Sequence, residues 1–348
     1  MTITAVIVGA GRMGRAHAAN LTRIPDVRVV GVADVRRDAA DALAGELGAA
    51  SAHDYRELVD RCRPDVVYLC TPAGEHLEQI TFAAERGVNI FVEKPLAPSV
   101  RAANAAADVI ERHGVLACVG YQWRHSPATD VAAAALAGHE VTLLAGWWYW
   151  TIPPVPWIRD RRTGGGQVFE QVTHLIDLMR YLAGDITTVF AAYSDNVIPP
   201  QELPNWDASA VTLQFAGGAV GSLHSTYALF SGIPGANGVD VVARDLLVRV
   251  TARSATVFRP GVEPVETPAR EGWNIDEEFV AILRCNDPGA LRATAREAAL
   301  SIGVSLAANY SAVTGEVVRL ADFMADPPDD PRIMPEAEPA SSRAVASQ

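Results

Sequence analysis

The stretch ITAVIVGAGRMG, residues 3–14, decides the fold of the N-terminal part of the chain. Its first six residues predict a strand buried on both faces, and a helical segment follows through Asn20. Gly9 permits a tight turn, Gly11 lets a pyrophosphate approach the backbone, and Gly14 allows close helix packing. The unpaired amides of the helix N-terminus favour an anion. The cofactor-binding residues predicted in this turn are Gly9, Gly11, Arg12, Met13 and Gly14.

An acidic residue follows at the distance that dinucleotide binding requires. Asp34 lies 20 residues beyond Gly14, at the end of a second apolar run, where its carboxylate would bind the ribose hydroxyls of NAD. Arg36 and Arg37 leave NADP open, because a guanidinium can hold the 2′-phosphate, but Asp34 would repel that group. The sequence therefore predicts NAD, with NADP as the alternative and Arg36 as a further cofactor contact.

The first 120 residues alternate buried strands with amphipathic helices. Strands are predicted at 3–8, 27–33, 66–70, 88–92 and 115–119, and helices at 36–47, 75–86 and 100–113. Apolar strands separated by helices indicate a doubly wound parallel sheet, so residues 1–122 are predicted to form a Rossmann domain.

Beyond Gly120 the pattern changes to consecutive strands. Helices are predicted at 128–137, 168–182 and 293–308, and strands at 141–150, 187–193, 208–215, 219–229 and 239–250. Strands without intervening helices favour an antiparallel arrangement. Residues 123–325 are therefore predicted to form an α+β domain with a large, mainly antiparallel open sheet, and residues 326–348, rich in Pro, Ala, Ser and Asp, a flexible tail.

Composition narrows the class of partner. A net charge of -12 argues against binding of nucleic acid or of an anionic membrane surface, which leaves a small molecule as the expected partner. No apolar run reaches the length of a membrane span and no signal segment is evident, so a cytoplasmic location is expected. The four cysteines form no C-x-x-C pair, which indicates reduced core residues rather than a metal site.

Two clusters of functional side chains follow predicted parallel strands. One is Thr71-Pro72 with His76, and the other is Glu93-Lys94. Open α/β sheets bind ligands at this carboxyl edge, so all five are predicted to lie at the cofactor. A partly desolvated lysine there can polarise a carbonyl or share an alcohol proton, although a solvated lysine in an ordinary loop is the alternative.

A third cluster lies in the second domain, after Gly164-Gly165-Gly166. Glu170 and His174 are four residues apart in a predicted helix and so share a face, and Asp177 is close to that face. An imidazole flanked by carboxylates suits proton transfer near neutral pH. The alternative is a solvated surface pair.

Aromatic and amide side chains supply further candidates. Tyr121 and Gln122 directly follow the last parallel strand and are placed to contact nicotinamide or substrate. Residues 147–150, WWYW, alternate between the two faces of a strand, so most of them pack in the core. Tyr149 is nevertheless retained as a substrate contact, because aromatic faces suit the apolar side of a sugar ring.

Together these motifs resemble the glucose-fructose oxidoreductase, inositol dehydrogenase and MocA-like family. The resemblance runs through GAGRMG, the pattern HxxxxxAAxxG from His76 to Gly87, EKP, GGGxxxExxxHxxD and AREAALSIGVSLAANYSAVTGEVV. It implies that Lys94 is the catalytic lysine, His174 the acid/base and Glu170 its carboxylate partner at the substrate hydroxyls. The chain departs from the family where Glu170 replaces the usual Asp and Val172 the usual Gly.

The activity that this resemblance implies is hydride transfer between NAD(P) and a secondary alcohol or ketone of a sugar, cyclitol or glycoside. Lys94, Tyr121, Tyr149, Glu170 and His174 would bind the substrate, and no metal is needed. Two alternatives remain open: a glycoside hydrolase that uses NAD for transient oxidation, and a non-catalytic NAD(P)-binding regulator. The resemblance also implies a homodimer or homotetramer that covers the open sheet.

Overall fold

The computed structural model describes residues 2–333, which form two compact units. Within the described residues, the first unit comprises residues 2–97, 101–125 and 272–299, and the second comprises residues 98–100, 126–271 and 300–333. The N-terminal part of the first unit ends at His125, close to the boundary expected at residue 122. Residues 272–299, expected in the second domain, instead return to the first unit.

A six-stranded parallel sheet in the order β3-β2-β1-β4-β5-β6 forms the centre of the first unit. Its strands are β1 (Ile3–Val8), β2 (Val27–Ala33), β3 (Ala50–Ala52), β4 (Val66–Leu69), β5 (Asn89–Val92) and β6 (Ala117–Val119). This is the doubly wound order of dinucleotide-binding folds, in which the topology reverses between β1 and β4. The predicted Rossmann domain is confirmed.

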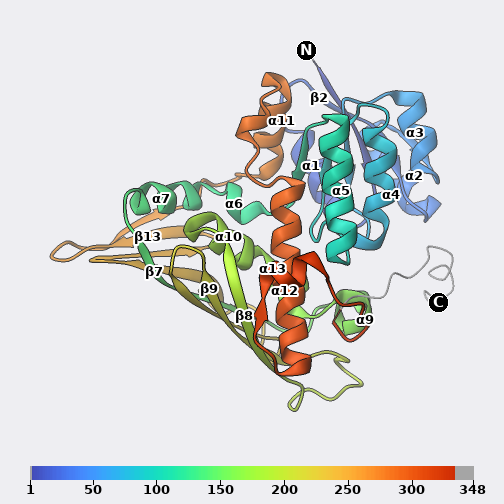
Figure 1. Ribbon diagram of the computed structural model, residues 1–348. Coiled ribbons are helices and arrows are strands. Elements are labelled where there is room, and N and C mark those ends of the chain that lie inside the picture. Colours follow the sequence, from blue (N-terminus) through green and yellow to red (C-terminus); the bar gives the residue numbers. More distant parts are fainter. Residues whose placement is uncertain (1, 334–348) are drawn as a thin grey trace. The chain divides into compact units, whose positions relative to one another are not determined.

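Helices follow the strands of this sheet, as the apolar and polar periodicity predicts (Figure 1). They are α1 (Arg12–Leu21), α2 (Arg37–Leu47), α3 (Tyr55–Cys62), α4 (Ala73–Ala84), α5 (Val100–His113), α6 (Gln122–His125) and α11 (Ile275–Cys285), with the turn η2 (Pro288–Ala290). Helix α11 packs on α1, although about 250 residues separate them. This contact is why residues 272–299 belong to the first unit.

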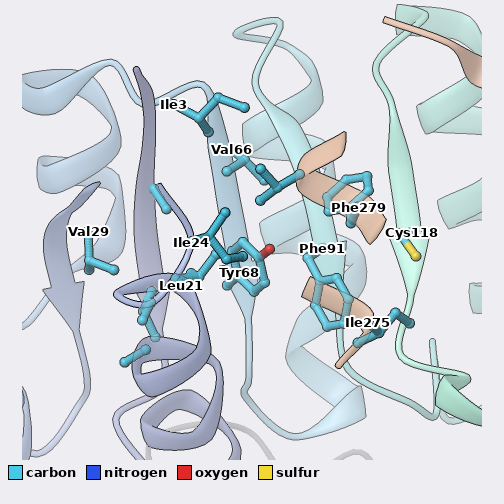
Figure 2. Close-up of a cluster of buried hydrophobic side chains, with 14 of the residues drawn as sticks. Ile3, Leu21, Ile24, Val29, Val66, Tyr68, Phe91, Cys118, Ile275 and Phe279 are labelled. Carbon is cyan, nitrogen blue, oxygen red and sulfur yellow. The ribbon is translucent and has the colours of Figure 1, made fainter. Parts of the chain in front are cut away.

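The core between α11 and the sheet is built from aromatic and aliphatic side chains (Figure 2). Phe91 stacks on Tyr68 with ring centroids 4.8 Å apart and meets Phe279 of α11 at 6.0 Å. All three rings are fully buried. The predicted helices did not include α11, although Ile275, Phe279 and Ile282 follow a helical spacing and the Asn274 side chain caps its N-terminus.

The second unit contains a nine-stranded sheet in the order β14-β13-β12-β11-β7-β10-β9-β8-β15. Its strands are β7 (Val141–Tyr149), β8 (Ile186–Ser194), β9 (Ala208–Phe215), β10 (Val220–Thr226), β11 (Asn237–Ala243), β12 (Leu246–Thr251), β13 (Ser254–Phe258), β14 (Val265–Pro268) and β15 (Val318–Arg319). All pairings are antiparallel except that of β10 with β7. The predicted α+β domain with a mainly antiparallel open sheet is confirmed.

The second unit also contains helices, several of which contact its sheet (Figure 1). They are α7 (Pro127–Leu136), α8 (Pro156–Arg159), α9 (Arg161–Gly164), the π-turn η1 (Val168–Val172), α10 (Thr173–Ala183), α12 (Ala295–Thr314) and α13 (Leu320–Ala325). Helix α7 contacts β12 and β13, α10 contacts β7 and β11, and α13 contacts β8. Helix α12 begins in the first unit and continues in the second from Leu300.

Several local expectations were wrong. The run 239–250, expected as one strand, is the hairpin of β11 and β12, because Asp245 turns the chain with a positive φ of 57°. The helix expected at 168–182 begins as a π-turn. The cysteines are not all core residues: Cys118 is buried, but Cys285 is exposed at the end of α11.

The expected tail from residue 326 is partly ordered by α12. Asn309 donates hydrogen bonds of 2.9 Å to the carbonyl of Ile333 and to that of Gly165, and the Ile333 side chain is buried. Residues 334–348 of the expected tail lie outside the described residues. Among the helices that the structure describes, none is both long and apolar enough to cross a membrane.

We expect Phe91→Ala to lower the free energy of unfolding by about 3 to 5 kcal/mol, because it opens a cavity between β5 and α11. Urea denaturation followed by circular dichroism measures this loss. Phe190→Ala is the matched control: Phe190 is 41% exposed on the second sheet, and its loss should cost less than about 1 kcal/mol. Equal losses in the two variants would contradict the assignment of Phe91 to the core.

Candidate dinucleotide and acid/base sites

The glycine turn after β1 meets the end of β4 at the point where the sheet topology reverses. A Cβ on Gly9 would lie 2.6 Å from the carbonyl oxygen of Cys70, and the φ of Gly9 is 98°, so only glycine fits. The Gly9 amide donates a 2.8 Å hydrogen bond to the carbonyl of Ala33 at the end of β2. Three strand ends are thereby joined at the edge where open α/β sheets bind ligands.

The other two glycines have the separate roles that the sequence predicts. A Cβ on Gly14 would lie 1.9 Å from the carbonyl oxygen of Gly9, so α1 can approach the turn only with glycine there. A Cβ on Gly11 would meet nothing within 4 Å and would project into open space. Gly11 is also the N-cap of α1, and no side chain caps that end. The backbone amides at Arg12 and Met13 therefore fit a pyrophosphate.

Asp34 is held by backbone amides beside this turn. One carboxylate oxygen accepts a 2.7 Å hydrogen bond from the Ala10 amide and the other a 2.8 Å bond from the Arg36 amide. Both oxygens retain acceptor capacity for ribose hydroxyls. The Arg36 side chain is largely exposed, with Nε 3.7 Å from Asp34. The residues present fit NAD, and the Asp34 charge opposes a 2′-phosphate.

In the cluster after β4, formed by Thr71, Pro72 and His76, the histidine has a structural role. His76 is buried, and its ring nitrogens lie 2.9 Å from the carbonyl of Thr71 and 3.1 Å from that of Leu96. Burial lowers the pKa of His76. Thr71 and Pro72 remain half-buried at the strand edge, where Thr71 donates to Gln79 at 2.7 Å. His76 thus holds the loops that follow β4 and β5 rather than presenting its ring at the surface.

Lys94 follows β5 and is the only lysine among the 29 lysine and arginine residues of the chain. It is half-buried, and its amide donates a 3.1 Å hydrogen bond to the carboxylate of the preceding Glu93. Arginine cannot release its proton in a protein, whereas lysine can. The chain therefore has arginine at the other 28 of these positions and an amine at the carboxyl edge of its parallel sheet.

Glu93 is part of a buried ionic network that the sequence did not reveal. The His17 imidazole of α1 lies 3.0 Å from Glu93 and 2.7 Å from Asp276 of α11, and all three side chains are buried. Burial disfavours a charged imidazole, but the bonds and charges of Asp276 and Glu93 outweigh it and raise the pKa of His17 to about 9. Burial also opposes the Glu93 charge, yet His17 keeps the pKa of Glu93 below its ordinary value.

The two residues after β6 differ in exposure. Tyr121 is fully buried, and its amide bonds to the carbonyl of Val119 at 2.6 Å. Gln122 is half-buried at the start of α6. The Tyr121 ring is therefore part of the core of the first unit, while Gln122 remains at the sheet edge.

The acid/base candidates of the second unit lie where η1 passes into α10. Glu170 is buried within η1, and its amide bonds to the carbonyl of Gly166 at 3.0 Å. His174 is half-buried in the first turn of α10 and stacks on Trp148 of β7 with ring centroids 6.1 Å apart and planes 15° apart. The π-turn thus interrupts the regular helix at the candidate carboxylate, and such π-turns often occur at functional sites.

Asp177 does not lie with Glu170 and His174 but packs against α12. It is fully buried and accepts a 3.0 Å hydrogen bond from Ser301 of α12, which also accepts one of 3.0 Å from Arg180. Asp177 therefore anchors α10 to α12. Tyr149 is 37% exposed at the end of β7.

Two buried polar residues near Glu170 were missed by the sequence reasoning. Within the described residues, the hydroxyl of Tyr227 and the side-chain oxygen of Gln167 have no hydrogen-bond partner. Burial and the negative charge of Glu170 raise the pKa of Tyr227 well above its ordinary range. Gln167 donates 3.2 Å bonds to Gln171 and to the carbonyl of Thr226. The bond from Gln167 to the carbonyl of Thr226, which ends β10 and precedes Tyr227, brings the two residues together.

These features define the class of the protein. A Rossmann sheet with a glycine turn that fits a pyrophosphate and an acid that fits a ribose is typical of NAD-binding domains, and the chain matches the family model described as "Oxidoreductase family, NAD-binding Rossmann fold" over residues 3–121. Residues 139–242 match the "GFO/IDH/MocA C-terminal domain". The chain belongs to the Gfo/Idh/MocA family of NAD-binding oxidoreductases.

Individual relatives agree with this assignment. The chain is 30% identical over 222 residues to an uncharacterized oxidoreductase, YrbE, of Bacillus subtilis, covering 62% of this chain and 64% of that protein. It is 29% identical over 232 residues to the scyllo-inositol 2-dehydrogenase (NAD(+)) of the same organism, covering 64% and 67%. The alignments thus span about two thirds of these relatives.

The fold has close counterparts among solved structures. A levoglucosan dehydrogenase in complex with NADH and levoglucosan superimposes with a TM-score of 0.79 at 20% identity, over 92% of this chain and all of that one. At this identity the likeness concerns the fold.

The two inner glycines provide a matched pair of variants. We expect Gly14→Ala to lower the free energy of unfolding of the cofactor-free protein by at least about 1 to 3 kcal/mol, because the Cβ of the alanine would overlap the Gly9 carbonyl. Gly11→Ala should leave that stability within about 0.5 kcal/mol but weaken NAD binding at least tenfold, because its Cβ enters the space assigned to the pyrophosphate. Thermal unfolding and NADH fluorescence titration distinguish the two; unimpaired binding by Gly11→Ala would refute the placement.

The His17 network makes stability depend on alkaline pH. Because the folded pKa of about 9 exceeds the ordinary 6.5, its stabilisation is complete below about pH 6.5 and is lost as pH rises through 9. The slope for one proton approaches about 1.4 kcal/mol per pH unit. Urea denaturation between pH 6 and about pH 10 should show this decline in the wild type and a shallower one in His17→Gln; parallel curves would contradict it.

Proposed function

We propose that this protein is an NAD-dependent dehydrogenase or reductase that acts on a CH–OH group of a sugar, cyclitol or glycoside. The observation that carries the proposal is the single lysine of the chain, Lys94, at the carboxyl edge of a sheet whose neighbouring turn fits NAD. Proton-coupled hydride transfer requires a group that shares the hydroxyl proton and stabilises the charge that grows on the reacting oxygen. A lysine beside the cofactor can do both.

Each side chain has a distinct task in this proposal. Bound NAD supplies the hydride acceptor. Lys94 shares the hydroxyl proton and, as the ammonium, stabilises the charge that grows on the reacting oxygen, while His174 takes or returns the proton. Glu170 orients the substrate hydroxyls and the imidazole. Asp34 and the glycine turn bind and orient the cofactor.

The substrate class is supported by the polar groups around Glu170. The buried oxygens of Gln167 and Tyr227 are an acceptor and a donor/acceptor that hydroxyl groups of a polyol would satisfy. Relatives named for scyllo-inositol and for levoglucosan act on compounds of this kind. Glu170 is longer than the aspartate usual at its position, which shifts the reach of the carboxylate and so the choice of polyol.

The open sheet of the second unit supports a homodimer or homotetramer. Its strand register places Leu143, Phe190 and Val220 on one face, each between 41% and 46% exposed. An apolar sheet face of this kind is typically covered by a partner.

The test is a spectrophotometric screen of inositols, sugars and glycosides with NAD and with NADP, in both directions, followed by Lys94→Ala and Lys94→Arg. We expect NADH to accumulate with at least one polyol and kcat to fall about 10²- to 10⁴-fold in both variants. NADH affinity should change far less than kcat, because neither variant alters the glycine turn.

Three results would contradict the proposal. Undiminished turnover in Lys94→Ala would remove the lysine from the mechanism. Glycoside cleavage without net NADH would indicate a hydrolase that oxidises its substrate transiently. Tight NADH binding with no turnover of any alcohol or ketone would indicate a regulator.

A further inference from the structure

We propose that His17 is a positioning residue for Lys94 and acts on it through the carboxylate of Glu93. The inference rests on the proposed role of Lys94, and it adds a residue from α1 and another from α11 to the machinery of that amine. These residues, His17 and Asp276, lie outside the sequence motifs that contain Lys94, Glu170 and His174.

The two oxygens of Glu93 have different partners. Oε1 lies 3.0 Å from Nε2 of His17, and Oε2 accepts the 3.1 Å bond from the backbone amide of Lys94. The backbone of Gly120 borders the same carboxylate, since a Cβ there would lie 3.2 Å from Oε2. The Glu93 side chain is therefore fixed on three sides, and it fixes the start of the turn that carries Lys94.

The other ring nitrogen of His17 is held by the segment that returns from the far end of the chain. Nδ1 lies 2.7 Å from Oδ1 of Asp276, whose Oδ2 accepts a 2.7 Å bond from Asn20. With carboxylates at both nitrogens, the ring satisfies both only as a doubly protonated imidazolium. The raised pKa of His17 agrees with this state at neutral pH.

The charge of His17 matters for the amine because Lys94 also acts on Glu93. The positive charges of His17 and Lys94 both favour the ionised form of this buried carboxylate. With His17 cationic, Glu93 is compensated independently of Lys94. If His17 were neutral, Lys94 would be left to compensate Glu93, and its side chain would be drawn toward that carboxylate and away from the substrate.

Other groups around His17 do not carry a competing charge. Its ring packs against Tyr68 at 5.4 Å and Phe91 at 4.7 Å, and Cys70 and Cys118 lie nearby in the same core. Burial raises the pKa of Tyr68 and of Cys70, so both stay neutral. The charges that face the imidazole are therefore those of Glu93 and Asp276.

The single lysine allows a test that needs no substrate. Acetylation of the purified protein by limiting acetic anhydride at pH 8, read by mass spectrometry, reports the fraction of Lys94 present as free amine, with the N-terminal amine as internal reference. We expect His17→Gln to slow Lys94 acetylation about tenfold and Glu93→Gln to accelerate it. With the active polyol, kcat should fall about 10²-fold in His17→Gln, while NADH affinity stays within about threefold.

Asn20→Ala is the matched control. It removes a donor to Asp276 and so lowers stability, but it leaves the contact of His17 with Glu93 intact. Lys94 acetylation and kcat should therefore match the wild type in this variant. Equal changes in Asn20→Ala and His17→Gln would show that loss of stability alone explains the effect, and would overturn the proposal.

The outcomes separate this inference from the proposed function. If His17→Gln folds and keeps the wild-type rate of Lys94 acetylation and the wild-type kcat, the positioning role of His17 is refuted, irrespective of the catalytic role of Lys94. If Lys94→Ala keeps full turnover, the proposed function fails, while the acetylation series still decides whether His17 governs the amine. If His17→Gln does not fold, Glu93→Gln decides: unchanged or slower Lys94 acetylation overturns the proposal.

Discussion

The buried contact of His17 with Glu93 and Asp276 joins three elements that are distant in the sequence: α1, the end of β5 and α11. The two carboxylates depend on the imidazole between them: removal of His17 would leave two buried carboxylates without their shared cation, and removal of either carboxylate would leave one ring nitrogen without its acceptor. The same three side chains therefore bind the returning segment to the Rossmann sheet and fix the residue that precedes Lys94. Stability and the candidate chemistry depend on one set of hydrogen bonds.

The glycine turn is the second constraint, and it is steric rather than electrostatic. The approach of α1 to Gly9 leaves no room for a side chain at Gly14, and this approach directs the free amides of α1 toward the space beyond Gly11. The turn also places His17 one helical turn from Gly14, facing the core. One helix thus carries the N-terminal amides that fit the cofactor and, on its buried side, the imidazole that contacts Glu93.

In the second unit the candidate chemistry depends on a helix that is not regular. The π-turn carries Glu170, and α10 starts with His174 stacked on Trp148. Gln167 at the start of η1 and Tyr227 after β10 lie in the same region, and their buried oxygens without a partner favour a polar ligand. A polyol satisfies such atoms at little cost, whereas an apolar ligand would leave them buried and unpaired.

The sequence by itself determined the Rossmann order, the glycine turn, Asp34 and the position of Lys94 at a strand end, because these depend on local periodicity and on residues that only a few conformations accept. It also predicted the open antiparallel sheet of the second unit. The tertiary structure alone decided that residues 272–299 return to the first unit, that His76 holds loops, that Asp177 anchors α10, and that His17 and Tyr227 are candidate functional residues. Each of these depends on contacts between residues far apart in the chain, and burial with its charge compensation cannot be read from spacing.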